Sequence, residues 1–406
     1  MATACTRPAR LSSLPPDYGY ERKRPMTDPL PEYHFLLRCL GPVDDPATLS
    51  GLRAKLDAGA IDWSVVIRIA DREMLSPALH PALSAKGLLD AVPAAVADGL
   101  RRRFVGNSAR NAKIRKEALG VIANLNDIGI EPALLKGGLH LFEAPPGEVG
   151  GRMMHDLDFM VPEADIERAI ESLRGMGYEP DQQSVRWTHA YFPLVHPTAM
   201  VAIDLHRYVG GQRVILPAAE AWREAVAVPA DGMRLRALHP THQVLHNIFH
   251  SQIQDRGHEF AIVYPRQLLA LAGICRRHEA AIDWQALGRL METHNLGRQL
   301  RARLYQAEQL LGLPRPAGIS PTAGDRFHHW RCLLQIRHDW LMRLMSCWSG
   351  ATSPFMRHHL EMIYGNGSNP VRINAHRLRH AWFLLRKYAG HTGLARQKMT
   401  YMRIKH

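Results

Sequence analysis

Three aspartates in the middle of the chain have the spacing of a metal-binding site. Asp156 and Asp158 flank Leu157 in a predicted strand, so side-chain alternation places both carboxylates on one face while Leu157 faces the core. Asp204 follows Ile203 in another predicted strand. Neighbouring carboxylates repel one another unless a cation lies between them. Three carboxylates from two strands therefore suit Mg²⁺, with Mn²⁺ as the alternative, because both ions prefer oxygen ligands.

A glycine pair upstream of these aspartates has the features of a phosphate-binding turn. Gly137 and Gly138 lie between a short predicted strand and a short apolar helix, where bare backbone N–H groups can approach phosphate oxygens. Taken alone, the pair also fits a simple tight turn. Lys136 and Arg152 are candidates for neutralising phosphate charge. The alternatives are a strand-end lysine that extends into solvent and an arginine that pairs with Asp156.

Histidines near the carboxylates leave a second kind of metal site open. His206 follows Asp204 by two residues and shares its face of the strand, and with His189 and His155 it fits a Zn²⁺ or Mn²⁺ site. Four further histidines lie on one face of a predicted helix: His239, His242, His246 and His250. That spacing allows metal binding, and it is also typical of a face that packs against a core.

Hydrophobic periodicity predicts helices on both sides of these residues. Residues 32–128 follow a helical pattern that ends in one long helix over 94–128, and residues 213–325 form a second helical region. Asp62 and Asp283 each stand between an isoleucine and a tryptophan, which is the pattern of a helix N-cap.

Between the two helical regions, residues 129–212 predict a compact α/β core. Its four predicted strands are 132–135, 157–161, 188–195 and 200–208. The predicted fold class is α+β and mostly helical, with a small mixed core of about four strands embedded between N- and C-terminal helical segments.

The positive charge is concentrated at the ends of the 406-residue chain. The 51 Lys and Arg residues exceed the 38 Asp and Glu residues by 13. Residues 326–406 hold fourteen basic and two acidic residues, whereas residues 25–325 carry a net charge of −2. We expect 326–406 to be a basic helical region, either a polyanion-binding surface or amphipathic helices docked on the body. The proline- and arginine-rich residues 1–31 predict a flexible basic arm, with Met26 as an alternative start.

Composition excludes several classes of protein. Hydrophobic residues make up 46% and charged residues 22%, which is typical of globular proteins and not of disordered or fibrous chains. Without a long apolar stretch, no integral membrane association is expected. The five cysteines form no CxxC pair, which argues against a zinc ribbon or a disulfide framework and favours a cytoplasmic location.

Three segments, taken in order, carry a resemblance to a known family. They are Leu135-Lys136-Gly137-Gly138, Arg152-x-x-His155-Asp156-Leu157-Asp158-Phe159-Met160-Val161 and Ile203-Asp204-Leu205-His206. Together they resemble the uncharacterised nucleotidyltransferase family of the polymerase-β-like nucleotidyltransferase superfamily. With the Ile-Asp-Trp helices and the His-rich helix, the resemblance covers roughly residues 35–300. This chain has His155 and Gly138 where the superfamily commonly has serine.

The resemblance implies transfer of a nucleoside monophosphate from an NTP to an acceptor hydroxyl, with Mg²⁺ as cofactor. The implied nucleotide-binding residues are Lys136, Gly137, Gly138 and Arg152, and the implied metal-binding and catalytic residues are Asp156, Asp158 and Asp204. Asp204 either binds a second ion or acts as base on the acceptor. The acceptor stays open among a small molecule, RNA and a protein. The alternatives are a non-catalytic nucleotide- or nucleic-acid-binding protein that uses the basic C-terminal region, and an Asp/His hydrolase.

Overall fold

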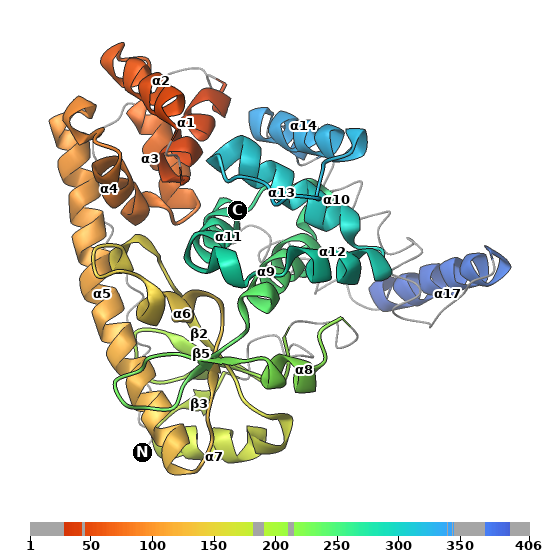
Figure 1. The fold of residues 1–406 in the computed structure, drawn as a ribbon. Helices are drawn as coiled ribbons and strands as arrows, with labels where there is room; N and C mark the ends of the chain where they lie inside the picture. The colour runs from red at the N-terminus through yellow and green to blue at the C-terminus, as the bar shows by residue number, and fades with distance from the viewer. Residues whose placement is uncertain are drawn as a thin grey trace. The chain divides into compact units, whose positions relative to one another are not determined.

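A computed structural model describes residues 28–42, 45–181, 191–209, 215–338, 340–342, 344 and 370–389 (Figure 1). The chain divides into two compact units, one of residues 1–258 with 263–330 and one of residues 259–262 with 331–406. The first unit contains the whole sheet and the predicted site. His189 and nearly all of the predicted basic arm lie outside the described residues.

Five helices form the first part of this unit. They are α1 (Leu30–Leu40), α2 (Pro46–Asp57), α3 (Trp63–Arg72), α4 (Ser76–Ala85) and α5 (Ala94–Asp127). The predicted cap at Asp62 is confirmed, because its side chain accepts hydrogen bonds from the backbone N–H groups of Ser64 and Val65 at the start of α3. The long helix predicted over 94–128 is confirmed as α5.

The core is one mixed sheet of seven strands in the order β3-β4-β5-β2-β1-β7-β6. The strands are β1 (Ala133–Leu134), β2 (Asp156–Met160), β3 (Glu179–Pro180), β4 (Leu194–Val195), β5 (Ala202–His206), β6 (Val226–Ala227) and β7 (Arg236–Ala237). The predicted α+β, mostly helical class is confirmed. The predicted count of about four strands was too low, because β3, β6 and β7 each have two residues and cannot show an alternating pattern.

Strands β2 and β5 are central neighbours and run parallel to each other. Their register pairs Asp158 with Asp204, and Leu157 with Ile203. Residues opposite each other on adjacent strands point to the same side of the sheet. The two aspartates that lie 46 positions apart in the sequence are therefore direct neighbours in the fold.

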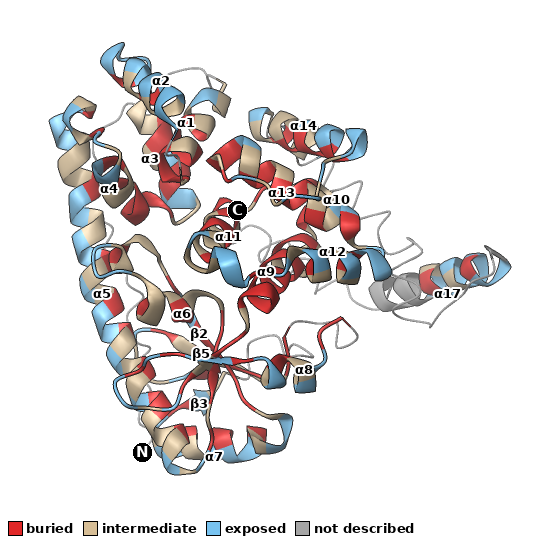
Figure 2. Cartoon of the chain, viewed as in Figure 1, coloured by how far each residue is buried: buried red, intermediate tan, exposed pale blue. Residues whose placement is uncertain are grey.

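The sheet is covered by α5 and by α7 (Ile166–Gly175), whose apolar residues share a core with the strands (Figure 2). Ile122 and Leu125 of α5, Ile170 of α7, and Leu157 and Phe159 of β2 are all buried in it. In the sequence, the short helix α6 (Lys136–Glu143) follows β1 and precedes β2. Burial of this shared apolar surface holds β2 in place at the centre of the unit.

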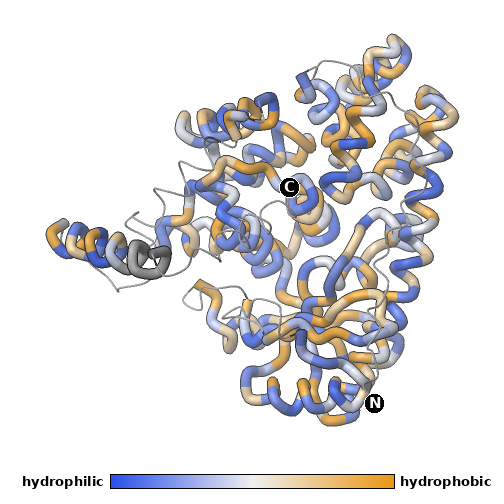
Figure 3. The backbone as a smooth tube through the Cα atoms, turned by 180° about the vertical axis from the view of Figure 1, so that it is seen from behind, coloured by the Kyte–Doolittle hydropathy of each residue, from blue (hydrophilic) through white to orange (hydrophobic). Residues whose placement is uncertain are grey.

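The chain after β5 is again mainly helical. Its helices are α8 (Ala218–Arg223), α9 (Pro240–Ile248) with a π-helix over Phe249–Gln254, α10 (Gly257–Phe260), α11 (Pro265–His278), α12 (Trp284–Thr293), α13 (Gly297–Leu311), α14 (Ala323–Arg337) and α17 (Pro370–Ala389). The predicted cap at Asp283 is confirmed, because its carboxylate accepts from the N–H of Ala286. In Figure 3, hydrophobic and hydrophilic residues alternate along most of the coloured helices, as expected where one side of a helix is buried.

Two features stand out among the described helices. Every residue of α9 is buried, and Figure 2 shows this helix almost entirely in red, although it contains Thr241, His242, Gln243, His246 and Asn247. Buried polar side chains need hydrogen-bond partners, so we expect polar groups to lie next to this helix.

None of the described helices combines the length and the apolar character that crossing a bilayer requires.

Candidate active site

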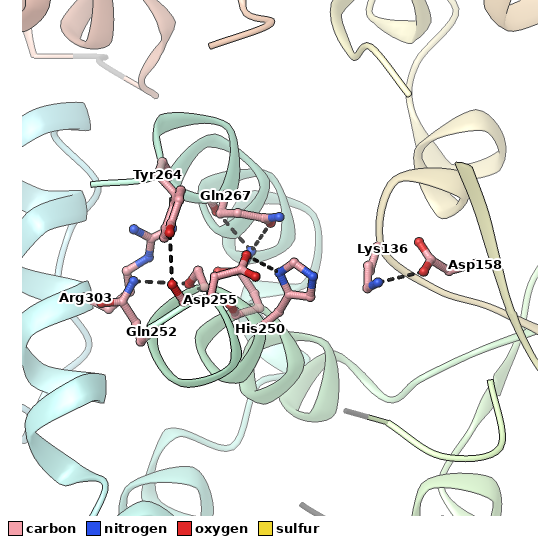
Figure 4. A network of polar contacts seen from close by, with 10 residues as sticks. Lys136, Asp158, His250, Gln252, Asp255, Tyr264, Gln267 and Arg303 are labelled. Atoms are coloured by element: carbon pink, nitrogen blue, oxygen red, sulfur yellow. Dashed lines mark hydrogen bonds and ion pairs between the residues drawn. The ribbon is translucent and has the colours of Figure 1, made fainter. Parts of the chain in front are cut away.

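Asp158 is the most deeply buried carboxylate of the predicted site. It is 2% exposed, and one of its oxygens, Oδ1, accepts from Lys136 Nζ at 2.6 Å and contacts His206 Nε2 at 2.8 Å. Figure 4 shows the contact with Lys136. Burial raises the pKa of Asp158, but the Lys136 ammonium and the His206 contact outweigh burial and hold this pKa well below its ordinary value. Asp158 is therefore ionised at neutral pH.

Lys136 serves as the fixed counter-charge of these carboxylates. Burial lowers the pKa of Lys136, but Asp158, together with Asp156 and Asp204, outweighs burial and raises it. The residue has φ of +46°, a left-handed conformation that is uncommon for lysine, at the first position of α6. This backbone sends the side chain toward β2, so the alternative of a lysine extended into solvent is wrong for this structure.

The ionised forms of Asp204 and Asp156 are disfavoured in this arrangement. Burial, then Asp158, then Asp156 raise the pKa of Asp204 to about 7. Burial and then Asp158 likewise raise the pKa of Asp156. Asp204 Oδ1 is buried and has no hydrogen-bond partner among the described residues. Ligand atoms of Asp158, Asp204 and His206 lie within 4.8 Å of one another, whereas Asp156 is not in that group.

The raised pKa of Asp204 predicts a pH-dependent stability. The unfolded carboxyl ionises near pH 3.8 and the folded one near pH 7, so this group's contribution to stability is present below pH 4 and is lost as pH rises to 7. Asp204→Asn should therefore be more stable than the wild type above pH 7, by about 2–4 kcal/mol, and equal to it near pH 3.5. Chemical denaturation in EDTA at several pH values measures this difference. A difference that does not change with pH would contradict it.

The glycine pair lies in the first turn of α6, and its two members have different surroundings. A Cβ on Gly137 would lie 3.1 Å from Arg152 Nε, so this glycine leaves room for the guanidinium. A Cβ on Gly138 would lie 2.8 Å from Leu134 Cδ1 and 3.1 Å from Leu157 Cδ2. Gly138 thus lets α6 pack directly on β1 and β2, while Gly137 leaves space for the Arg152 side chain beside the start of α6.

Gly138→Ala should destabilise the fold. The new methyl group would meet two buried core side chains, Leu134 and Leu157, that have little room to move. Overpacking of this kind costs about 1–3 kcal/mol, and we expect a matching fall in the free energy of unfolding measured with urea. Gly120→Ala, on α5 with open space around its Cα, is the matched control and should leave the stability unchanged or raised. Equal effects of the two substitutions would contradict the packing argument.

Arg152 is held in place by two asparagines that the hydrophobic pattern did not reveal. Asn107 and Asn111 are buried on α5, one helical turn apart, and their side-chain amides donate to the Arg152 carbonyl oxygen at 3.0 and 2.8 Å. They also donate to the carbonyls of Gly150 and Val149. Buried asparagines spaced by four residues on an otherwise apolar stripe were the signal available in the sequence.

A cavity of about 830 Å³ reaches Lys136, the partner of Asp158; most residues that line it are uncharged, and all but one of its charged side chains are cationic. Lys136, Arg152 and Arg266 line it, together with three further basic residues and one acidic residue, Glu148. Burial, and then Arg266 and Arg277, lower the pKa of Arg152 to about 10. Neither Arg152 nor Arg266 forms an ion pair with a carboxylate within the described residues, so the expected alternative pairing of Arg152 with Asp156 is not observed. Such a cavity favours an anion.

A family model described as "Uncharacterised nucleotidyltransferase" matches residues 59–312, which include α3 to α13, the sheet and most of the residues that line the cavity. The chain belongs to this nucleotidyltransferase family. The family predicted from the sequence is confirmed, and the matched range overlaps the expected 35–300 but begins and ends later in the chain. Neither the curated proteins nor the solved structures give a match to the chain.

The histidines of this nucleotidyltransferase family member separate into different environments. His206 contacts Asp158, whereas His155 Nε2 lies 2.8 Å from Met74 Sδ. Of the predicted helical face, His239 caps α9 by accepting from the N–H of Thr241, and His242 contacts Glu224 at 3.4 Å. The remaining two, His246 and His250, line the cavity.

Proposed function

We propose that the protein is a Mg²⁺-dependent nucleotidyltransferase that moves a nucleoside monophosphate from an NTP to an acceptor hydroxyl. The observation that carries this proposal is the position of Lys136, which both contacts Asp158 and lines the cavity with its cationic side chains. Family membership supports the general type of reaction. The nucleotide, the metal and the acceptor are our proposal.

The chain's own residues suit the binding of a triphosphate. The start of α6 offers backbone N–H groups at Gly137 and Gly138, and a helix N-terminus favours negative charge. Arg152 and Arg266 bring two guanidinium groups without carboxylate partners among the described residues to the same cavity. Phosphate oxygens would relieve the repulsion between these cations, so binding and charge neutralisation come from the same groups.

The carboxylates fit a hard divalent cation. Asp204 has a buried oxygen without a partner among the described residues, and the raised pKa values of Asp156 and Asp204 mark a site with too much negative charge. We propose that Asp156, Asp158 and Asp204 hold Mg²⁺, or Mn²⁺. When bound, the ion neutralises phosphate charge and polarises the phosphorus under attack. Lys136 lines the cavity, contacts Asp158, and offsets part of the carboxylates' charge when no nucleotide is present.

The test incubates the full-length protein with each of the four NTPs, labelled at the α-phosphate, with cell extract and either Mg²⁺ or EDTA. We expect one NTP to release pyrophosphate and label one fraction of the extract, and EDTA to abolish both. The labelled fraction then shows whether the acceptor is a small molecule, RNA or a protein. If the protein binds an NTP or nucleic acid but consumes no NTP with Mg²⁺, the alternative of a non-catalytic binding protein holds instead.

The basic C-terminal region belongs to the proposal as a polyanion-binding surface. The described part of α17 exposes Arg372, Arg377 and Arg379, and these charges favour an anionic partner such as RNA.

A cytoplasmic location is also part of the proposal. It is supported by Cys39, Cys275 and Cys332, which are free thiols.

A further inference from the structure

His250 and Asp255 form a histidine–carboxylate pair beside the same cavity as Lys136. His250 lines the cavity, and its Nδ1 lies 3.2 Å from Asp255 Oδ2. Figure 4 shows the imidazole on the side of Asp255 that faces Lys136 and Asp158. The Asp255 carboxylate beside Nδ1 favours, through its charge, the tautomer with the proton on that nitrogen and the lone pair on Nε2, although the contact lacks the geometry of a hydrogen bond. The pair therefore has the composition of an oriented general base.

The backbone that carries this pair is unusual. The helix that begins as α9 widens into a π-helix over Phe249–Gln254, and Arg256, directly after Asp255, has φ of +58°. The hydroxyl of Tyr264 donates to the carbonyl oxygen of Asp255 at 3.0 Å and so fixes the end of this segment (Figure 4). π-helical turns recur at functional sites, and left-handed backbone at a residue other than glycine persists only where its surroundings hold it.

A second histidine of the same helical segment, His246, lies beside His250 and also lines the cavity. It is buried, lines the cavity, and its ring centroid lies 6.4 Å from that of His250. Burial, and after it Lys136 and His250, hold the pKa of His246 well below its ordinary value. Lys136, His246 and His250 all line this one cavity, and the charges of Lys136 and His250 both act on His246.

The carboxylates themselves are poorly placed to accept a proton from a molecule in the cavity. Among the described residues that line the cavity are Lys136 and His250 but not Asp204. Asp204 sits on β5 opposite Asp158, next to the buried His206. A hydroxyl group that enters the cavity therefore meets His250 and not Asp204, which leaves Asp204 to the metal.

We propose that His250 is the general base of the reaction and that Asp255 positions it. This inference rests on the proposed nucleotidyl transfer and assigns its acceptor to the part of the cavity beside His250. The acceptor oxygen forms a bond to the α-phosphorus, and the bond from that phosphorus to the bridging oxygen breaks. Pyrophosphate leaves with the electron pair of the broken bond, and the hydroxyl proton moves to Nε2 of His250 and then to solvent.

The test compares His250→Ala, His250→Gln and Asp255→Asn with the wild type, using the NTP and the extract fraction that support labelling. We expect both His250 variants to lose about 10²–10⁴-fold in kcat, because a positioned base contributes that much. The KM for the NTP and the affinity for its α,β-methylene analogue should stay unchanged. Added imidazole should restore part of the activity of His250→Ala, a rescue that a purely structural role would not give. Asp255→Asn should lose about 10–100-fold, and Asp255→Glu should recover part of that loss.

His294→Ala is the matched control, because this histidine lies at the end of α12 and does not line the cavity. It should keep the wild-type kcat. If the wild type is active and His250→Gln is equally active, the assignment of His250 as the base is wrong, while the proposed function still stands. A loss confined to KM or to analogue binding has the same consequence. A wild type that consumes no NTP with Mg²⁺ overturns the proposed function and this inference with it. Melting temperatures show which variants fold, and His250→Gln carries the test if the alanine variant does not.

Discussion

Asp158→Asn should reduce Mg²⁺-dependent NTP turnover by on the order of 10³-fold or more, which is the scale expected when a charge that stabilises the transition state is removed. The substitution keeps the shape of the side chain but removes its charge. Lys136 and His206 both contact Asp158 Oδ1, so the ionised carboxylate is the centre of the site. Pyrophosphate release at saturating NTP measures the effect.

Asp231→Asn is the control for this experiment. Asp231 is exposed, pairs with Arg115 at 3.0 Å and takes no part in the cavity. We expect it to keep full turnover. Circular dichroism should show that Asp158→Asn is folded, since asparagine can still accept a hydrogen bond from Lys136. Turnover of Asp158→Asn at the wild-type rate would rule out a catalytic role for this carboxylate.

Lys136→Met should destabilise the protein by about 3–5 kcal/mol in the absence of metal, because it breaks a buried ion pair and leaves one charge behind. The ammonium lies 2.6 Å from a carboxylate whose side chain is 3% exposed. Without it, Asp156, Asp158 and Asp204 lose their only close lysine counter-charge in the described part of the chain. The melting temperature in EDTA should therefore fall clearly.

Mg²⁺ should then protect the Lys136→Met variant more than it protects the wild type. A divalent cation among the carboxylates replaces the missing positive charge, whereas in the wild type Lys136 already supplies it. Lys116→Met, at an exposed position of α5, is the control and should change neither the melting temperature nor its response to Mg²⁺. Equal stabilisation of all three proteins by Mg²⁺ would mean that the ion does not bind beside Lys136.

Local patterns were sufficient where a feature depends on neighbouring residues. The caps at Asp62 and Asp283 and the long helix α5 follow from side chains within a few positions of one another. The β-strand alternation that places Asp156 and Asp158 on one face is also local. Strands of two residues, such as β6 and β7, contain no such pattern and exist because they pair with neighbours already in place.

Contacts between distant segments could not be predicted in this way. The carbonyl of Arg152 is held by Asn107 and Asn111 from α5, and Arg266 reaches the same cavity from α11. The predicted single face of four histidines also divides, because His239 becomes a cap and the π-helix carries His250 to Asp255. A regular helical period contains no information about where a helix widens.

The chain's amino-acid order was enough to indicate the type of chemistry, through three aspartates, a glycine pair and their order along the chain. These signals consist of residue types and of short spacings between them, and both can be taken directly from the sequence. Tertiary structure alone decided that Lys136 and His206 share one oxygen of Asp158, that Asp158 lies opposite Asp204, and that a cavity whose charged side chains are all but one cationic reaches Lys136. Those relations arise from strand register and helix packing, which depend on the burial of side chains far apart in the sequence.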